Sequence, residues 1–277
     1  MRTGYEDYPL DALPSKGRFY SEGTKIQIRP ASTKEIENYS TMNEDVFLDS
    51  ENQINEIIGS CSSITAGMKK MSYKDLLEGD KLQLLLAIRD RTFQKGENEI
   101  PVDLPCPSCK HDNRRNLNNT ILDATEEEDE ELEKYYSEEQ RCYVIKTKSY
   151  GEVILHPPRV GVTKAVVDWG VKQQQDKKEF DRGLVTLIPY LIKDYRKLES
   201  KDGLNERMFS NIDADIKTWD KTKYAIVYRM AEKIKVGADP KFKISCDNCG
   251  EVIEQPFRFP TGKKSLFIIS DISGELL

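Results

Sequence analysis

The sequence contains no run of eighteen apolar residues and only two histidines among its 277 residues. The first absence excludes a conventional membrane-spanning helix. The N-terminus has no apolar h-region, which predicts no secretory signal. We therefore expect a protein without a membrane segment that is made and kept in a cytoplasm.

Catalytic motifs are also missing. The chain has no G-x-S-x-G nucleophile elbow, no G-x-x-x-x-G-K-[ST] phosphate loop and no G-x-G-x-x-G dinucleotide loop. Carboxylates are plentiful but scattered, and nothing in the sequence selects a pair for acid and base catalysis. We predict that the protein is not an enzyme and has no catalytic residues.

The overall charge is acidic. Lys and Arg total 42 against 48 Asp and Glu, which leaves a net charge of −6. A general binder of the phosphate backbone carries the opposite balance, so nucleic acid is an unlikely partner. The length is sufficient for a large hydrophobic core, and no disulfide scaffold is required.

The patterning predicts an α+β fold in which helical modules accompany a β module. We expect residues 1–31 to form an N-terminal arm with one strand at Lys25–Arg29, because apolar and polar residues alternate there. Residues 32–98 are expected to form a helical module. Its first helix is capped by Ser32 or Thr33, and its strongest helix is predicted from Tyr73 to Phe93.

Residues 121–240 are predicted to form an insertion that begins with an acidic linker. Seven of the eight residues from Glu126 to Glu133 are acidic, which indicates a solvated segment, with a docking surface for a basic partner as the alternative. A β-hairpin is expected from 142–147 and 151–155, followed by two or three helices between about 161 and 236. A last strand is expected near 266–269.

Two C-x-x-C pairs stand far apart in the chain: Cys106 with Cys109, and Cys246 with Cys249. Each pair lies between strand-like flanks, which is the pattern of a zinc ribbon whose halves are hairpins. We predict that the four cysteines bind one structural Zn²⁺. Residues 99–120 would then be the first half of a split zinc ribbon, and residues 241–277 would contain the second half and the C-terminal strand.

The spacing between the pairs is unusual, since 136 residues lie between Cys109 and Cys246. Closing a loop of that order costs about 4.7 kcal/mol, whereas structural zinc supplies roughly 10–16 kcal/mol. The metal is therefore able to hold the ends of the insertion together, and we expect its loss to disorganise the docking of residues 120–240.

Other roles for these side chains fit less well. A thioredoxin-like redox pair requires a C-x-x-C at the start of a helix, and a catalytic zinc requires an open coordination position. We expect His111 and His156 to be surface residues, and Cys61 and Cys142 to be buried free thiols.

Three passages in order resemble the T-even-type phage baseplate hub and hub-assembly proteins of contractile tails. The first is Leu13–Gly17 with Phe19–Tyr20 and the strand that ends in Arg29–Pro30. The second is Leu76–Asp80 leading into the leucine-rich stretch 84–89, and the third is the cysteine pair that follows.

The resemblance implies a non-enzymatic structural or assembly component of a contractile-tail baseplate hub. Its partners would be other baseplate, hub or tail-tube proteins, and its location the virion tail baseplate, or the host cytoplasm during assembly. The aromatic residues of the arm, Tyr5, Tyr8, Phe19 and Tyr20, either anchor a neighbouring subunit or pack back on their own domain. The alternative function is a zinc-ribbon protein of transcription or nucleic-acid binding, for which Arg114–Arg115 lie beside the first cysteine pair.

Overall fold

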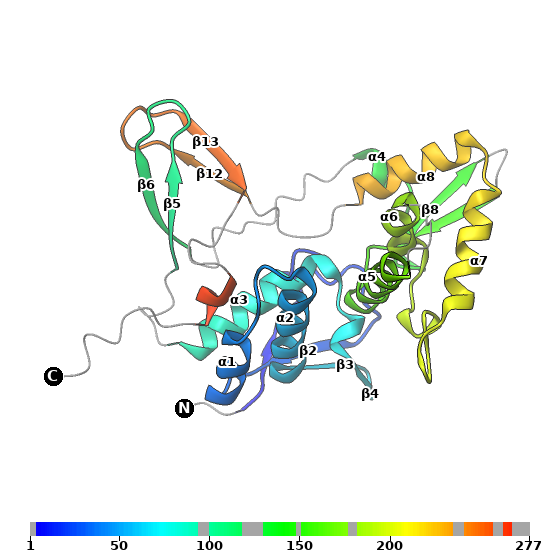
Figure 1. Cartoon of the computed structure of the whole chain (residues 1–277), viewed down its shortest axis with the longest axis horizontal. Helices are drawn as coiled ribbons and strands as arrows, with labels where there is room; N and C mark the ends of the chain where they lie inside the picture. Colours follow the sequence, from blue (N-terminus) through cyan, green and yellow to red (C-terminus); the bar gives the residue numbers. More distant parts are fainter. Residues whose placement is uncertain are drawn as a thin grey trace.

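A four-stranded antiparallel sheet forms the base of the N-terminal region, in the order β1-β2-β3-β4 (Figure 1). The computed structural model describes residues 4–93, 100–117, 130–147, 151–176, 182–234, 241–256 and 263–267. The strands of this sheet are β1 (Glu6–Tyr8), β2 (Thr24–Ile28), β3 (Ser62–Ala66) and β4 (Lys69–Met71). The predicted strand at Lys25–Arg29 is confirmed, and its pairing with β3 places the predicted arm and the predicted helical module in one sheet.

Three helices pack on this sheet (Figure 1). They are α1 (Thr33–Ser40), α2 (Phe47–Cys61) and α3 (Lys81–Thr92), with 3-10 turns at η1 (Leu10–Ala12), η2 (Tyr73–Asp75) and η3 (Glu78–Asp80). Helix α1 begins with a capping box, because the Ser32 side chain accepts from the Glu35 amide while the Glu35 carboxylate accepts from the Ser32 amide. The cap predicted at Ser32 is therefore present.

The single helix predicted from Tyr73 to Phe93 is wrong in its first half. Leu76 and Leu77 have extended backbone between η2 and η3, and α3 begins only at Lys81. The cause is tertiary pairing: the Val160 amide donates to the Leu76 carbonyl at 2.9 Å, and the Glu78 amide donates to Pro158 at 2.8 Å. Backbone groups engaged by the 158–160 segment are not available to continue a helix.

A second sheet and four helices follow in the C-terminal half. The sheet consists of β7 (Tyr136–Ser137), β8 (Cys142–Thr147) and β9 (Gly151–Leu155), preceded by the short α4 (Glu130–Glu133). The helices are α5 (Val160–Gln175), α6 (Arg182–Leu191), α7 (Glu206–Lys217) and α8 (Lys221–Lys233), with η4 (Tyr195–Lys197), β10 (Glu199–Ser200) and β11 (Gly203–Leu204) between α6 and α7. The predicted hairpin is confirmed. Between Val160 and Lys233 the described residues form four α-helices, where two or three were predicted.

One buried cluster joins the two halves. It contains Leu13, Ile28 and Leu84 from the N-terminal region together with Leu155 and Val227 from the C-terminal half. A second cluster, centred on Trp169 and Phe209, is confined to residues 162–216. The insertion predicted at 121–240 therefore packs directly on the N-terminal region through apolar side chains.

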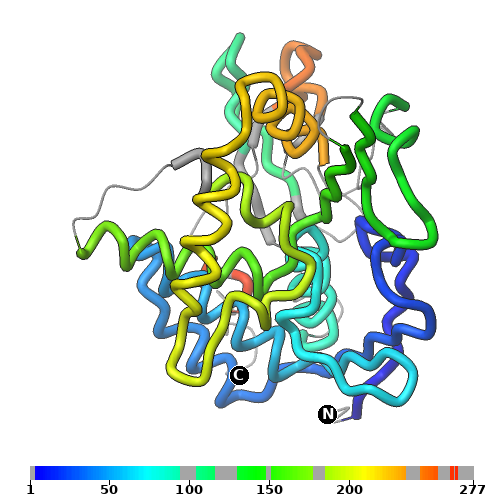
Figure 2. Tube along the Cα trace, turned by 90° about the vertical axis from the view of Figure 1, so that its right-hand side faces the viewer, coloured from blue at the N-terminus to red at the C-terminus, as the bar shows by residue number. Residues whose placement is uncertain are grey.

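The segment 263–267 returns to the N-terminal helices (Figure 2). It forms the 3-10 helix η5 (Lys263–Leu266), so the strand predicted near 266–269 is wrong for residues 266 and 267, while 268–269 lie outside the described residues. The Phe267 ring lies 4.9 Å from that of Tyr39 and 6.3 Å from that of Phe93, measured between centroids. Burial of this ring among aromatic neighbours favours a compact turn over a strand edge.

Most aromatic residues of the arm pack inward. Phe19 and Tyr20 are 2% and 1% exposed, Tyr8 is half-buried, and Tyr5 is 44% exposed. Phe19 packs against Tyr136 and Tyr143 of the second sheet at ring-centroid distances of 5.7 Å. The arm is thus largely an internal part of the fold.

Two further hairpins carry the C-x-x-C pairs. They are β5 (Ile100–Pro105) with β6 (Asp112–Leu117), and β12 (Lys241–Ser245) with β13 (Val252–Pro256), and we call them the cysteine hairpins. Figure 1 shows them side by side, although about 130 residues separate them in the sequence. No helix in the described part of the chain has the length and apolar character needed to cross a membrane.

Candidate metal centre

Each cysteine hairpin turns through a knuckle of the same construction. The Cys106 amide donates to the His111 carbonyl at 2.8 Å, and the Cys246 amide donates to the Glu251 carbonyl at 2.8 Å. These bonds close two turns of identical length. In each turn the first cysteine directly follows a strand, and the second lies three residues further along the chain. The two knuckles are therefore local repeats of one structure.

A left-handed residue completes each turn. Lys110 has φ of 60° and Gly250 has φ of 74°, and both follow the second cysteine of their pair. Their amides donate to the carbonyls of Cys106 and Cys246, at 3.0 and 2.9 Å. Glycine adopts this conformation without cost, whereas lysine adopts it at some expense in backbone energy.

The four thiols converge on one point. The sulfur atoms of Cys106, Cys109, Cys246 and Cys249 all lie within 4.8 Å of one another. Across the hairpins, the sulfur atoms of Cys106 and Cys249 are 3.7 Å apart and those of Cys109 and Cys246 are 3.6 Å apart. These distances far exceed the roughly 2.05 Å of a disulfide bond, and all six cysteines are free thiols. The arrangement is close enough to bind one metal ion.

Asn113 connects the two knuckles and breaks their symmetry. Its side chain is completely buried and donates to the carbonyls of Leu104 and His111 and toward the sulfur of Cys246 at 3.7 Å. Its carbonyl oxygen accepts from the Asp247 amide at 2.8 Å. The corresponding position of the other hairpin is the buried, apolar Ile253.

An ion pair on the outside holds the hairpins in the same register. Arg115 donates twice to the Asp247 carboxylate, at 2.6 and 2.8 Å. Both side chains are partly exposed, so the pair contributes geometry more than stability. Arg115, one of the two arginines considered for nucleic-acid contact, is therefore already engaged within the module.

The groups around the knuckles favour the ionised form of two of the four thiols, Cys109 and Cys246. Burial raises the pKa of Cys246, but the amides of Cys249 and Asn248 outweigh it and lower that pKa to about 6. The pKa of Cys109 is also lowered, first by the Asn248 side chain and then by the His111 amide. The Glu251 amide lowers the pKa of Cys249, but the Cys109 thiol and burial outweigh it and raise that pKa to about 12. The polypeptide therefore favours the thiolate, which is the form that binds metal, at Cys109 and Cys246.

The remaining thiols and histidines lie elsewhere. Cys61 and Cys142 are buried free thiols, which confirms the expectation for both. His111 is exposed, as expected for a surface residue. His156 is not a surface residue: it is partly buried, and burial followed by Lys193 lowers its pKa to about 4.

A second polar site links two of the passages that carried the family resemblance. Asp80 is fully buried and accepts from the Ser15 amide at 2.9 Å, from the Ser15 hydroxyl at 2.7 Å and from the Tyr20 hydroxyl at 2.8 Å. The Tyr20 oxygen in turn accepts from the Leu77 amide at 3.0 Å. We call these residues the Asp80 network. This network was not predicted from the sequence, although an acidic residue next to a leucine-rich stretch could have indicated it.

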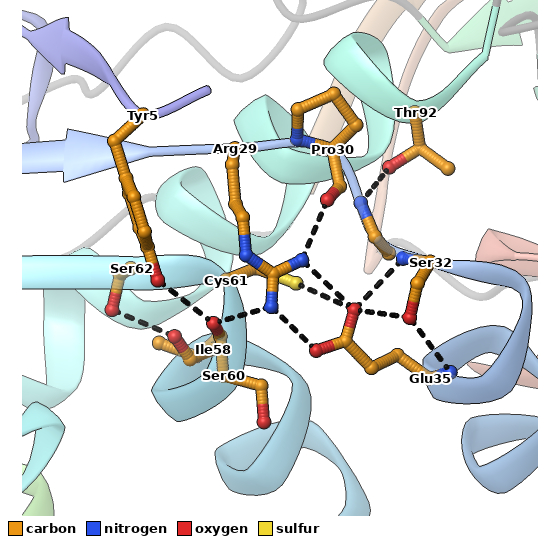
Figure 3. Close-up of polar contacts among 11 residues, drawn as sticks. Tyr5, Arg29, Pro30, Ser32, Glu35, Ile58, Ser60, Cys61, Ser62 and Thr92 are labelled. Atoms are coloured by element: carbon orange, nitrogen blue, oxygen red, sulfur yellow. Dashed lines mark hydrogen bonds and ion pairs between the residues drawn. The ribbon is translucent and has the colours of Figure 1, made fainter. Parts of the chain in front are cut away.

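The Arg29–Pro30 passage has a comparable structural role (Figure 3). The Arg29 guanidinium donates to both carboxylate oxygens of Glu35 at 2.9 and 2.6 Å and to the Ser60 carbonyl at 2.8 Å. Hydrogen bonds from Arg29 lower the pKa of Glu35 to about 2, whereas burial raises the pKa of the adjacent Cys61 thiol to about 12. The cluster joins the end of β2 to the start of α1 and the end of α2.

The family model described as T4 bacteriophage base plate protein matches residues 6–258, which is most of the chain. No curated protein and no solved structure matched. A family match of this extent includes the Asp80 network, the second sheet and both cysteine hairpins.

The protein belongs to the T4-type baseplate protein family. Membership supports a structural role in the phage tail baseplate, among other baseplate proteins, and is in keeping with the absence of catalytic motifs from the sequence. The resemblance to T-even-type baseplate proteins inferred from the three passages is thereby confirmed.

Proposed function

We propose that this chain is a structural or assembly component of the baseplate hub of a contractile tail, and that it binds one structural zinc ion. The observation that carries the baseplate role is the family match over residues 6–258. The hub position rests on the resemblance of residues 13–30 and 76–89 to hub and hub-assembly proteins. Its action is contact with hub, tube or other baseplate subunits rather than chemistry.

The zinc proposal is supported by the spacing of the sulfurs. A tetrahedron with Zn–S bonds of about 2.3 Å has edges of roughly 3.8 Å, and two cross-hairpin sulfur distances measure 3.6 and 3.7 Å. Cys106, Cys109, Cys246 and Cys249 would each supply one thiolate. Four thiolates fill the coordination shell, so the metal would stabilise the module and would not activate water.

Metal analysis of the purified chain tests the zinc proposal directly. We expect one zinc per chain, retained on dialysis and lost when Cys106 or Cys246 is replaced by serine. Cys142→Ser is the matched control, because this thiol is buried away from the knuckles, and it should keep the metal. Stoichiometric iron would replace zinc as the cofactor, while a metal-free chain with a disulfide in either pair would overturn the site.

The baseplate role has its own test. An epitope-tagged chain expressed during infection should co-purify with hub subunits, either in finished tails or in baseplate intermediates. Deletion of the gene should yield tails arrested before the hub is complete, with heads unaffected. A chain that never associates with tail subunits, and whose deletion leaves infective tails, would refute the proposal.

A further inference from the structure

Strand β9 lies at the edge of the second sheet. The strand order is β7-β8-β9, so only one side of β9 is paired with another strand. The register aligns Val144 with Ile154 and Lys146 with Glu152. An unpaired strand edge offers backbone donors and acceptors to a further strand.

The backbone directions along β9 follow from two hydrogen bonds. The Val144 amide donates to the Tyr135 carbonyl at 2.7 Å, toward β7 and away from β9. In an antiparallel pair the residue opposite, Ile154, then also points its amide and carbonyl away from β8. The His156 amide, two residues on, points to the same side, where it donates to the Tyr190 carbonyl at 2.8 Å.

Glu152 and Ile154 therefore present backbone donors and acceptors at the outer edge of β9. Within the described part of the chain no backbone or side-chain group bonds to these amides and carbonyls. Helix α6 packs against β9, and its Tyr190 carbonyl accepts from the His156 amide just beyond the strand. Two successive outward residues provide the spacing that one added strand requires.

A groove lined by both apolar and polar residues lies beside this free edge. It has a volume of about 350 Å³ and lies between β9, the end of α6, and α7. Ile154, Leu191, Ile192 and Ile212 line it together with Trp219. Ile154 is 36% exposed, so the wall beside the edge is open to solvent. Such a groove accepts the side chains of an added strand while the edge binds its backbone.

Acidic side chains stand on both walls of the groove. Glu152 lies on β9 and Asp215 on α7, and both side chains line it. Glu152 is only 4.0 Å from an exposed Lys146 amine, and Asp215 has no ion-pair partner among the described residues. Lys223, the one cation at the rim, is placed 4.4 Å over the Trp219 ring. The Asp215 carboxylate, which has no ion-pair partner among the described residues, favours a cationic occupant, and Glu152 adds to this because its ion pair with the exposed Lys146 is long, at 4.0 Å.

We infer that this groove binds an extended segment of another protein chain, which adds to β9 as a further strand and whose residues alternate between apolar and basic. The apolar residues would enter the space between Ile192, Ile212 and Trp219, and the basic ones would meet Glu152 and Asp215. That the segment belongs to another baseplate subunit rests on the proposed function. The existence of the groove and its preference for a basic, apolar segment do not depend on the proposed function.

Peptide binding tests the inference on the full-length protein. The probe is a fluorescein-labelled eight-residue peptide of alternating lysine and isoleucine, and anisotropy is the readout. We expect saturable binding that weakens by on the order of tenfold when the lysines become glutamates. N-methylation of every second peptide amide should abolish binding for one of the two possible sets, odd or even positions, and not for the other. The reason is that only one set of amides faces the strand edge.

Backbone pairing is tested by Ile154→Pro. This variant removes the outward amide but no bond to β8, so the hairpin should persist while peptide affinity falls by about tenfold or more. Ile154→Val keeps the amide and is the matched control, with nearly unchanged affinity. Circular dichroism checks that both variants are folded.

Charge is tested independently by the double variant Glu152→Lys and Asp215→Lys, which should reverse the preference toward the glutamate peptide. The control Glu138→Lys and Asp202→Lys makes the same change of net charge at exposed positions outside the groove. Equal binding by all variants, or none by the wild-type chain at millimolar peptide, would overturn the inference. So would a homodimer that Ile154→Pro dissociates, because the occupant would then be a second copy. Loss of baseplate association with peptide binding intact would affect only the proposed function.

Discussion

Replacement of Asp80 by alanine should be among the most destabilising single changes in the N-terminal region. The Asp80 side chain is fully buried and accepts three hydrogen bonds, two from Ser15 and one from Tyr20. Ser15 and Tyr20 are each 1% exposed, so water cannot replace the lost acceptors. The substitution therefore leaves three buried donors unsatisfied.

The size of the effect follows from the cost of each orphaned group. A buried donor without a partner costs about 1–3 kcal/mol, and the three donors share one site, so their costs do not simply add. Relief of the buried charge offsets part of the loss, since burial raises the pKa of Asp80 despite its hydrogen bonds. We expect a net loss of about 3–4 kcal/mol from the free energy of unfolding.

Asp80→Asn separates hydrogen bonding from charge. The amide keeps one carbonyl acceptor for the Ser15 amide but presents a donor to the Ser15 and Tyr20 hydroxyls. The Tyr20 oxygen already accepts from Leu77, so it is poorly placed to accept again. We expect a loss of about 2 kcal/mol, between wild type and Asp80→Ala.

Urea unfolding monitored by circular dichroism measures both variants. Asp11→Ala is the matched control, because this aspartate is exposed, and it should change stability by about 0.5 kcal/mol or less. A loss below about 1 kcal/mol for Asp80→Ala would show that the network is not a structural lock. Equal losses for the alanine and asparagine variants would show that the carboxylate charge, not the set of acceptors, stabilises the site.

Three other outcomes are expected. Chelation of the proposed zinc ion, or Cys106→Ser or Cys246→Ser, should increase hydrogen exchange in the cysteine hairpins while leaving the exchange of α2, α3 and α5 unchanged. Protonation of His156 should reduce the free energy of unfolding as the pH falls from about 6.5 to about 4, because the lowered pKa of the folded state means that the unfolded chain takes up the proton first. The loss approaches about 3 kcal/mol. His156→Gln should remove this part of the pH dependence. Phe267→Ala should cost about 3–4 kcal/mol in urea unfolding, because the 1% exposed ring packs against Tyr39.

Local signals in the sequence predicted the elements that depend on local interactions. The capping box at Ser32 and the alternation at Lys25–Arg29 are determined by neighbours within four residues, and both elements formed as expected. The repeated knuckles were also predictable, because C-x-x-C followed by a polar turn determines its own hydrogen bonds. Predicting that the two cysteine pairs lie close together required the additional assumption that they share a metal ion.

The predictions were wrong where segments distant in the sequence form hydrogen bonds with the backbone. Leu76 and Leu77 have a helical pattern, but the 158–160 segment binds their backbone groups and holds them extended. His156 looked like a surface residue beside prolines, yet its amide is bonded to α6 and its ring is partly buried. The free edge of β9 also depends on strand order, which periodicity in a single segment does not determine.

The position of the insertion changes the role that the cysteine site has to fulfil. On spacing alone, the metal had to bear the cost of closing the loop between Cys109 and Cys246. In the structure, Leu155, Val160 and Val227 of the insertion share a buried cluster with residues of the N-terminal region, so side-chain packing already holds the insertion in place. Fully burying even a few such side chains stabilises the fold by several kcal/mol, at about 1.5–3 kcal/mol each, which is comparable with the loop-closure cost of about 4.7 kcal/mol. The binding energy of the proposed metal would then be available to order the cysteine hairpins themselves, whose described side chains form a small cluster around Ile253. A defect in metal binding should therefore impair contacts made by the hairpins before it disturbs the groove beside β9.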